Sequence, residues 1–80
     1  MSVRSEILDQ FTQVAREQGK RLSPLSDDLP LLDSGLDSLC FAIIVTRLDA
    51  SLGIDPFSDN EGAPFPVNLG DFIRFYENAA

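Results

Sequence analysis

Helical periodicity is the sequence feature that most limits what this chain can fold into. In the first segment the apolar residues recur three or four positions apart, and they are Ile7, Leu8, Phe11, Val14 and Ala15. Gly19 and two basic residues follow this run, as is common where a helix ends. The pattern predicts a first helix that extends roughly from Val3 to Gln18.

A second apolar segment contains β-branched residues that would also suit a strand. Three features favour a helix. Asp37 or Ser38 can cap its start, and Gly53 can end it. Its apolar positions also keep helical spacing to the end of the segment, at Leu39, Ala42, Val45 and Leu48. We therefore predict a second helix from Ser38 to Leu52, with these four side chains facing inward.

The C-terminal segment carries the signals of a third main helix. Asn68 can cap its start, and Asp71 lies favourably close to the positive end of the helix. The residues expected on its buried face are Leu69, Phe72, Ile73 and Tyr76. The turn-rich stretch before it leaves room for at most one short helix, near Ser58 to Glu61. Because the chain has no repeats and no convincing strand pairs, we predict an all-α fold: a small four-helix bundle of three main helices and one short helix.

The first two helices are separated by a long loop that mixes proline, glycine, serine and aspartate with scattered leucines. The leucines expected to anchor this loop to the core are Leu25, Leu29, Leu32 and Leu36. A loop of this length without secondary structure is uncommon in a compact domain and is often functional.

Length and composition indicate one soluble globular domain over residues 1–80. Hydrophobic residues make up 44% of the chain and charged residues 24%, a balance that separates it from disordered proteins. The start of the chain resembles no signal peptide, and no apolar run approaches the length of a membrane span. We expect a cytoplasmic protein that does not enter membranes.

Several kinds of chemistry are excluded by missing residues. The chain has no histidine, and its single cysteine, Cys40, permits neither an internal disulfide nor a thiolate metal cluster. Ser38 has no histidine to activate it, and Lys20 is the only lysine. The acidic loops around Gly35 and Gly62 lack the ligand spacing of an EF-hand. We therefore expect no metal site and no protease or esterase activity.

The charge of the chain excludes another class of partner. The net charge is −7, and residues 23–55 carry six acids against one base. A domain this acidic repels phosphate backbones, so nucleic-acid binding is not expected. Basic protein surfaces are the better match.

The stretch LLDSGLDSL contains the feature that points to a function. A serine before a helix is by itself only a common helix start. In combination, however, Leu32, Gly35, Asp37, Ser38 and Leu39 resemble the attachment motif of acyl and peptidyl carrier proteins. The resemblance covers most of the chain, from the amphipathic first helix and the leucine-rich loop to the final LGDFIRFY segment.

This resemblance implies that Ser38 receives 4′-phosphopantetheine from coenzyme A, with Gly35, Asp37 and Leu39 as the motif around it. The group then carries an acyl or aminoacyl cargo as a thioester, in fatty-acid synthesis or secondary metabolism. The implied partners are a phosphopantetheinyl transferase, a loading ligase or acyltransferase, and a downstream synthase or transferase. The resemblance also implies that the chain is not itself an enzyme, and a monomer is expected. The alternative is an acidic helical interaction module without a prosthetic group.

Two further expectations concern surfaces. Typical carriers of fatty-acid type resemble one another in an acidic second helix, whereas Asp49 is the only acid between Ser38 and Leu52. If the inward positions are as predicted, helical spacing sends Cys40, Ile43, Arg47 and Ala50 outward, and we expect a partner-binding face of Leu39, Cys40, Ile43 and Arg47. A rotated helix that buries Cys40 and Ile43 is the other possibility.

The second surface is a cleft for the cargo. The apolar residues that could line it are Phe41, Ile44, Val45, Phe57, Phe65 and Ile73. Ordinary core packing is the favoured explanation for each of them.

Overall fold

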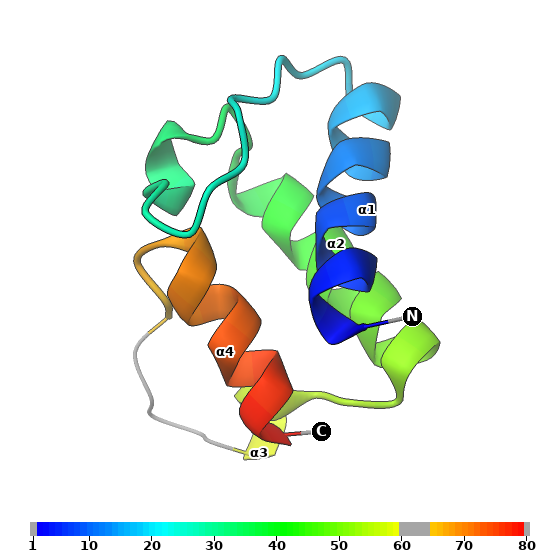
Figure 1. The fold of residues 1–80 in the computed structure, drawn as a ribbon. Helices are drawn as coiled ribbons and strands as arrows, with labels where there is room; N and C mark the ends of the chain where they lie inside the picture. The colour runs from blue at the N-terminus through cyan, green and yellow to red at the C-terminus, as the bar shows by residue number, and fades with distance from the viewer. Residues whose placement is uncertain (1, 60–64, 80) are drawn as a thin grey trace.

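Helices are the only regular elements in residues 2–59 and 65–79, which are the residues described by a computed structural model of the chain (Figure 1). In chain order they are α1 (Val3–Glu17), the 3₁₀ turn η1 (Leu31–Asp33), α2 (Ser38–Leu52), α3 (Pro56–Asp59) and α4 (Leu69–Ala79). The prediction of an all-α fold is confirmed. Within these residues, no helix is long and apolar enough to cross a membrane.

Helix α1 forms where the periodicity predicts it and ends one residue earlier, at Glu17. Ser2 caps it, because the Ser2 side chain accepts a hydrogen bond from the Ser5 backbone N–H over 3.1 Å. The buried side is the predicted one: Ile7, Phe11, Val14 and Ala15 are buried, and Leu8 packs against the core from its edge.

Helix α2 has the predicted bounds and ends. Asp37 is its N-cap residue, and its Oδ1 accepts a hydrogen bond from the Cys40 backbone N–H over 3.0 Å. Gly53 ends the helix in the left-handed conformation, with φ of 69°. Of the two candidate caps, Asp37 and Ser38, the structure shows Asp37 as the cap and Ser38 as the first helical residue.

The rotation of α2 about its own axis differs from the prediction. The buried stripe is Cys40, Phe41, Ile44 and Leu48, whereas Leu39 is 61% exposed and Ala42 is exposed. Every residue from Leu39 to Val45 is apolar, so the periodicity there supports two stripes equally. The observed stripe buries the larger side chains, because it places the Phe41 ring and Ile44 in the core instead of Leu39 and Ala42.

Of the partner-binding face expected on α2, Leu39 is exposed, whereas the exposure expected of Cys40 is wrong. Cys40 is only 1% exposed, and Ile43 is half-buried against the core. Arg47 reaches back to α1, where its guanidinium donates two hydrogen bonds to the Glu17 carboxylate, one of them over 2.9 Å. Because α2 is rotated so that Cys40 is buried, Cys40, Ile43 and Arg47 do not form the shared exposed surface that was expected.

Helix α4 agrees with its prediction. The Asn68 side chain accepts a hydrogen bond from the Asp71 backbone N–H over 2.8 Å, and the four predicted residues are buried. The short helix α3 begins at Pro56, two residues before the predicted start. Glu61, the predicted end, lies outside the described residues.

Helices α1, α2 and α4 surround the core. Phe11 of α1 meets Phe72 of α4 edge to face, with ring centroids 5.5 Å apart, and Ile44 of α2 is fully buried beside them. Edge-to-face rings are a favourable arrangement beyond the area they bury. The core therefore joins segments that are far apart in the sequence.

The long loop covers one end of the helices, opposite the two chain termini (Figure 1). Leu31 and Leu36 are buried, and Leu25 and Leu29 are half-buried. Leu32 is 91% exposed, so its predicted role as an anchor is wrong. The tight turn of η1 explains this difference, because it points Leu31 into the core and its neighbour outward.

Backbone hydrogen bonds attach this loop to the start of α4. The Leu31 N–H donates to the Val67 carbonyl over 2.8 Å, and the Leu69 N–H donates to the Leu29 carbonyl over 2.9 Å. These bonds hold the residues before Ser38 in a fixed position relative to the third main helix.

Candidate functional site

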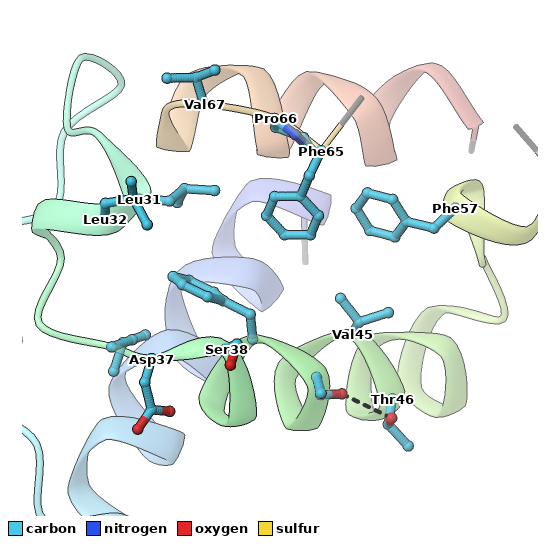
Figure 2. Close-up of a pocket in the computed structure, with 13 residues that line it drawn as sticks. Leu31, Leu32, Asp37, Ser38, Val45, Thr46, Phe57, Phe65, Pro66 and Val67 are labelled. Carbon is cyan, nitrogen blue, oxygen red and sulfur yellow. Dashed lines mark hydrogen bonds between the residues drawn. The ribbon is translucent and has the colours of Figure 1, made fainter. Parts of the chain in front are cut away.

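Ser38 lies at the exposed start of α2 (Figure 2). Within the described part of the chain, its hydroxyl takes no part in a side-chain hydrogen bond, because Asp37 caps the helix instead. An exposed hydroxyl at the first turn of a helix is accessible to a second protein. The adjacent dipole and backbone N–H groups favour an anion there.

Asp37 carries a permanent negative charge beside this serine. The Cys40 backbone N–H that it caps, together with the Cys40 side chain and Lys20, lowers the pKa of the carboxyl to about 2. The Lys20 Nζ lies 3.3 Å from Asp37 Oδ2. The carboxylate is therefore ionised throughout the neutral range, and it is both cap and ion-pair partner.

Lys20 is a site residue that sequence reasoning missed. It is the only lysine of the chain, and the sequence gives no sign that it approaches Ser38. Its position depends on the path of the chain after α1, where the Lys20 N–H donates to the Ala15 carbonyl over 2.8 Å. No local sequence signal links this turn to Asp37, so only the folded chain shows the contact.

Gly35 is required by the geometry of the motif. Its φ is 94°, which side-chain-bearing residues rarely adopt. A Cβ at this position would overlap the Arg21 carbonyl oxygen. The glycine thus lets the segment after α1 pack directly against the loop that leads to Ser38.

The loop between η1 and α2 is held by the buried Ser34. Its hydroxyl donates to the Leu31 carbonyl over 2.6 Å and accepts from the Leu36 N–H over 3.3 Å. The hydroxyl thereby pairs the Leu36 N–H, and the Leu31 carbonyl also accepts from the Ser34 N–H over 3.2 Å. The approach to Ser38 is therefore fixed by local bonds as well as by the leucines.

A cavity of about 850 Å³ opens beside Ser38, between α2 on one side and residues 65–67, which precede α4, on the other (Figure 2). It is lined by Leu31, Leu32, Leu36, Asp37, Ser38, Phe41, Ala42, Val45, Thr46, Phe57, Phe65, Pro66 and Val67. The Phe57 and Phe65 rings are stacked, with centroids 5.3 Å apart. A cavity of this size with few polar groups is typical of small-molecule sites.

The predicted cleft agrees with this cavity in part. Phe41, Val45, Phe57 and Phe65 line it, as expected. Ile44 and Ile73 do not, because both are fully buried in the core. The lining residues that the predicted cleft lacked include Leu31 and Leu32 of η1 and Pro66 and Val67 before α4. These two segments are joined by the hydrogen bond from the Leu31 N–H to the Val67 carbonyl.

The exposed face of α2 is almost free of charge. Its exposed residues after Ser38 are Leu39, Ala42, Thr46, Asp49, Ala50 and Ser51. The Thr46 hydroxyl donates to the Ala42 carbonyl over 2.9 Å. Only Asp49 is acidic on this face. The second helix therefore lacks the row of acids that is typical of fatty-acid carriers, as the sequence predicted, although the exposed residues are not the predicted ones.

The described residues contain no group of three or more histidine, cysteine, aspartate and glutamate side chains able to hold a metal ion. Comparisons of the chain with models of protein families, with curated proteins and with solved structures find no match. The functional conclusion therefore depends on the chemistry of the residues around Ser38.

Proposed function

We propose that this chain is a carrier protein, which holds an acyl or aminoacyl group as a thioester on a 4′-phosphopantetheine arm attached to Ser38. The observation that carries the proposal is an exposed serine hydroxyl at the first position of α2, free because Asp37 caps the helix, beside an apolar cavity. In this proposal α1, α2, α3 and α4 form a small four-helix bundle that presents the arm.

The residues at the start of α2 suit the attachment chemistry. The Ser38 Oγ forms a bond to the phosphorus of coenzyme A that bears the pantetheine, and the bond from that phosphorus to the adenylate side breaks, releasing adenosine 3′,5′-bisphosphate. The chain has no histidine to take the hydroxyl proton, so a base on the transferase takes it. The bound group supplies a terminal thiol, which this chain otherwise offers only as the buried Cys40.

The cavity gives the proposal a second function, shelter for the cargo. Phe41, Val45, Phe57 and Phe65 provide apolar surface next to the attachment point. An acyl group that enters this space is removed from water, which stabilises the folded, loaded protein by roughly 25 cal/mol for each Å² of apolar area buried. The chain itself remains a tether and not an enzyme.

The partners in this proposal are a phosphopantetheinyl transferase, a loading ligase or acyltransferase, and a downstream synthase or transferase. They would meet the exposed side of α2, where Leu39 offers an apolar contact and Asp49 is the only acid. Enzymes that recognise an acidic helix with a basic patch have little to bind here. We therefore propose a specialised carrier with dedicated partners.

The alternative proposal is an interaction module that carries no group. It is favoured by the exposed apolar side chains of Leu32, Leu39 and Val67, which a docking partner could cover. Both proposals predict protein partners, but only the carrier proposal predicts a covalent change at Ser38.

Intact mass separates the two. The purified chain is incubated with coenzyme A, magnesium and a broad-specificity transferase, and its mass is measured. The carrier proposal predicts a gain of one phosphopantetheine group in the wild type and in Ser51→Ala, a control at the far end of the same helix, and no gain in Ser38→Ala. An unchanged mass in the wild type would leave the interaction module as the better proposal.

A further inference from the structure

The basic residues of this chain are distributed unequally around Ser38. Three of the six pair with carboxylates elsewhere: Arg4 with Asp27, Arg47 with Glu17 and Arg74 with Asp71. Lys20 is different, because its ion pair is with Asp37, the residue that directly precedes Ser38. The only lysine of the chain is thus held at the start of α2.

The backbone fixes Lys20 in this place. Gly19 reverses the chain after α1 with φ of 67°, and the Lys20 N–H then bonds to the Ala15 carbonyl. The Arg21 carbonyl packs against Gly35, with no space for a side chain between them. The turn after α1 therefore contacts the loop before α2 directly after the lysine, at Arg21, and the Ser23 N–H donates to the Ser34 carbonyl over 2.9 Å.

We infer that Lys20 binds the phosphodiester formed on Ser38 and keeps Asp37 paired at the same time. The inference depends on the proposed function, because it requires the group on Ser38. Attachment puts a second negative charge beside the Asp37 carboxylate, and the two repel each other. The ammonium of a lysine has three donors, and the Asp37 contact engages one side of it, so the same group can meet a phosphate oxygen.

A lysine suits this arrangement better than a planar guanidinium would. Its charge is compact and lies at the end of a flexible stem, so it can lie between two anions that differ in shape. The side chains of Lys20 and Asp37 are 38% and 52% exposed, which leaves room for an added group. Lys20 acts here as a positioning residue, since it orders the base of the arm and takes no part in bond formation.

The presence of a single lysine makes the test direct. The chain is labelled with ¹³C and ¹⁵N in lysine only, and its one side-chain signal is recorded before and after modification, which intact mass confirms. The inference predicts a shift of the Lys20 Cε and Hε signals on modification, reduced by 0.5 M salt. An unchanged signal on a fully modified chain would overturn it.

Stability supplies a second readout. Lys20→Gln should lower the melting temperature of the modified chain by roughly 2–4 °C more than that of the unmodified chain, the shift expected for one added exposed ion pair. Lys20→Arg should restore part of the difference. Arg74→Gln, which also removes one positive charge and one exposed pair with an aspartate, should lower both forms equally.

The two levels of the proposal fail separately. If Ser38 accepts no group, the carrier function is wrong and the role of Lys20 is wrong with it. If Ser38 is modified but Lys20→Gln affects both forms alike, only the role of Lys20 is overturned.

Discussion

At the scale of single residues, the path of the chain around Ser38 depends on a glycine. Gly35 combines a positive φ with direct backbone contact, whereas Gly19 has a positive φ and open space around it. A side chain at Gly19 would add only the cost of the left-handed backbone conformation, whereas one at Gly35 would also collide with the Arg21 carbonyl.

Replacing these glycines by alanine should have unequal effects. Gly19→Ala should lower the free energy of unfolding by about 1 kcal/mol, the cost of the left-handed conformation alone. Gly35→Ala should lower it by roughly 2–4 kcal/mol, because the loop must also move away from Arg21. Urea denaturation of both variants measures the difference, and equal losses would show that the contact does not constrain the loop.

Asp37 should make the stability of the chain depend on pH in acid. Its pKa is about 2 in the folded chain and about 3.9 in an unfolded one. The ionised cap therefore contributes its stabilisation above about pH 4. This contribution is lost as the pH falls from there toward 2.

Asp37→Asn should remove this part of the acid sensitivity, because asparagine also caps a helix but does not titrate. Unfolding midpoints measured between pH 5 and pH 2 should fall less steeply in the variant than in the wild type. The carboxyls of Glu17 and Asp27, whose pKa values are also lowered by their arginine partners, titrate in both proteins and cancel in the comparison. Parallel curves would contradict the role of Asp37.

At the scale of elements, the ends of the helices and the buried faces of α1 and α4 were predictable, whereas the rotation of α2 was not. Caps and stop signals are local, so Asp37, Gly53 and Asn68 mark α2 and α4 in the sequence. The rotation of α2 depends on which apolar stripe packs best against α1 and α4, which is a property of the assembled core. For the same reason the sequence pattern does not distinguish Leu31, which is buried, from Leu32, which is exposed and does not anchor the loop.

Truncation of α2 side chains tests this rotation. Ile44→Ala should lower the free energy of unfolding by roughly 2–5 kcal/mol, because Ile44 is fully buried. Leu39→Ala should change it by less than about 0.5 kcal/mol, because Leu39 is mostly exposed. Chemical denaturation measures both, and the reverse order would support the stripe first predicted from the sequence.

At the scale of the whole molecule, the site is formed by segments that only the fold brings together. The cavity combines η1, α2, α3 and the residues before α4, and Lys20 arrives from the turn after α1. The motif and four of the cavity residues could be predicted from the sequence, and these four are Phe41, Val45, Phe57 and Phe65. The contact of Lys20 with Asp37 and the contribution of Val67 depend on long-range packing.

The cavity predicts how an attached cargo should affect the chain. As the acyl group on the modified protein is lengthened, the NMR signals of Val45 and Phe57 should shift progressively, because both line the cavity. The signal of Ile73 should change much less, because it lies in the core outside the cavity. Signals at Val45 and Phe57 that stay constant with chain length would show that the cargo remains outside.

The most direct test of the central claim locates the group on the chain. Trypsin cuts after Arg21 and Arg47, so Ser38 lies on one peptide, Leu22 to Arg47, together with Ser23, Ser26 and Ser34. After reaction with coenzyme A and a transferase, fragmentation of this peptide should place one phosphopantetheine group on Ser38 and none on the other serines. A peptide that remains unmodified, or a group found on another serine, would contradict the carrier function.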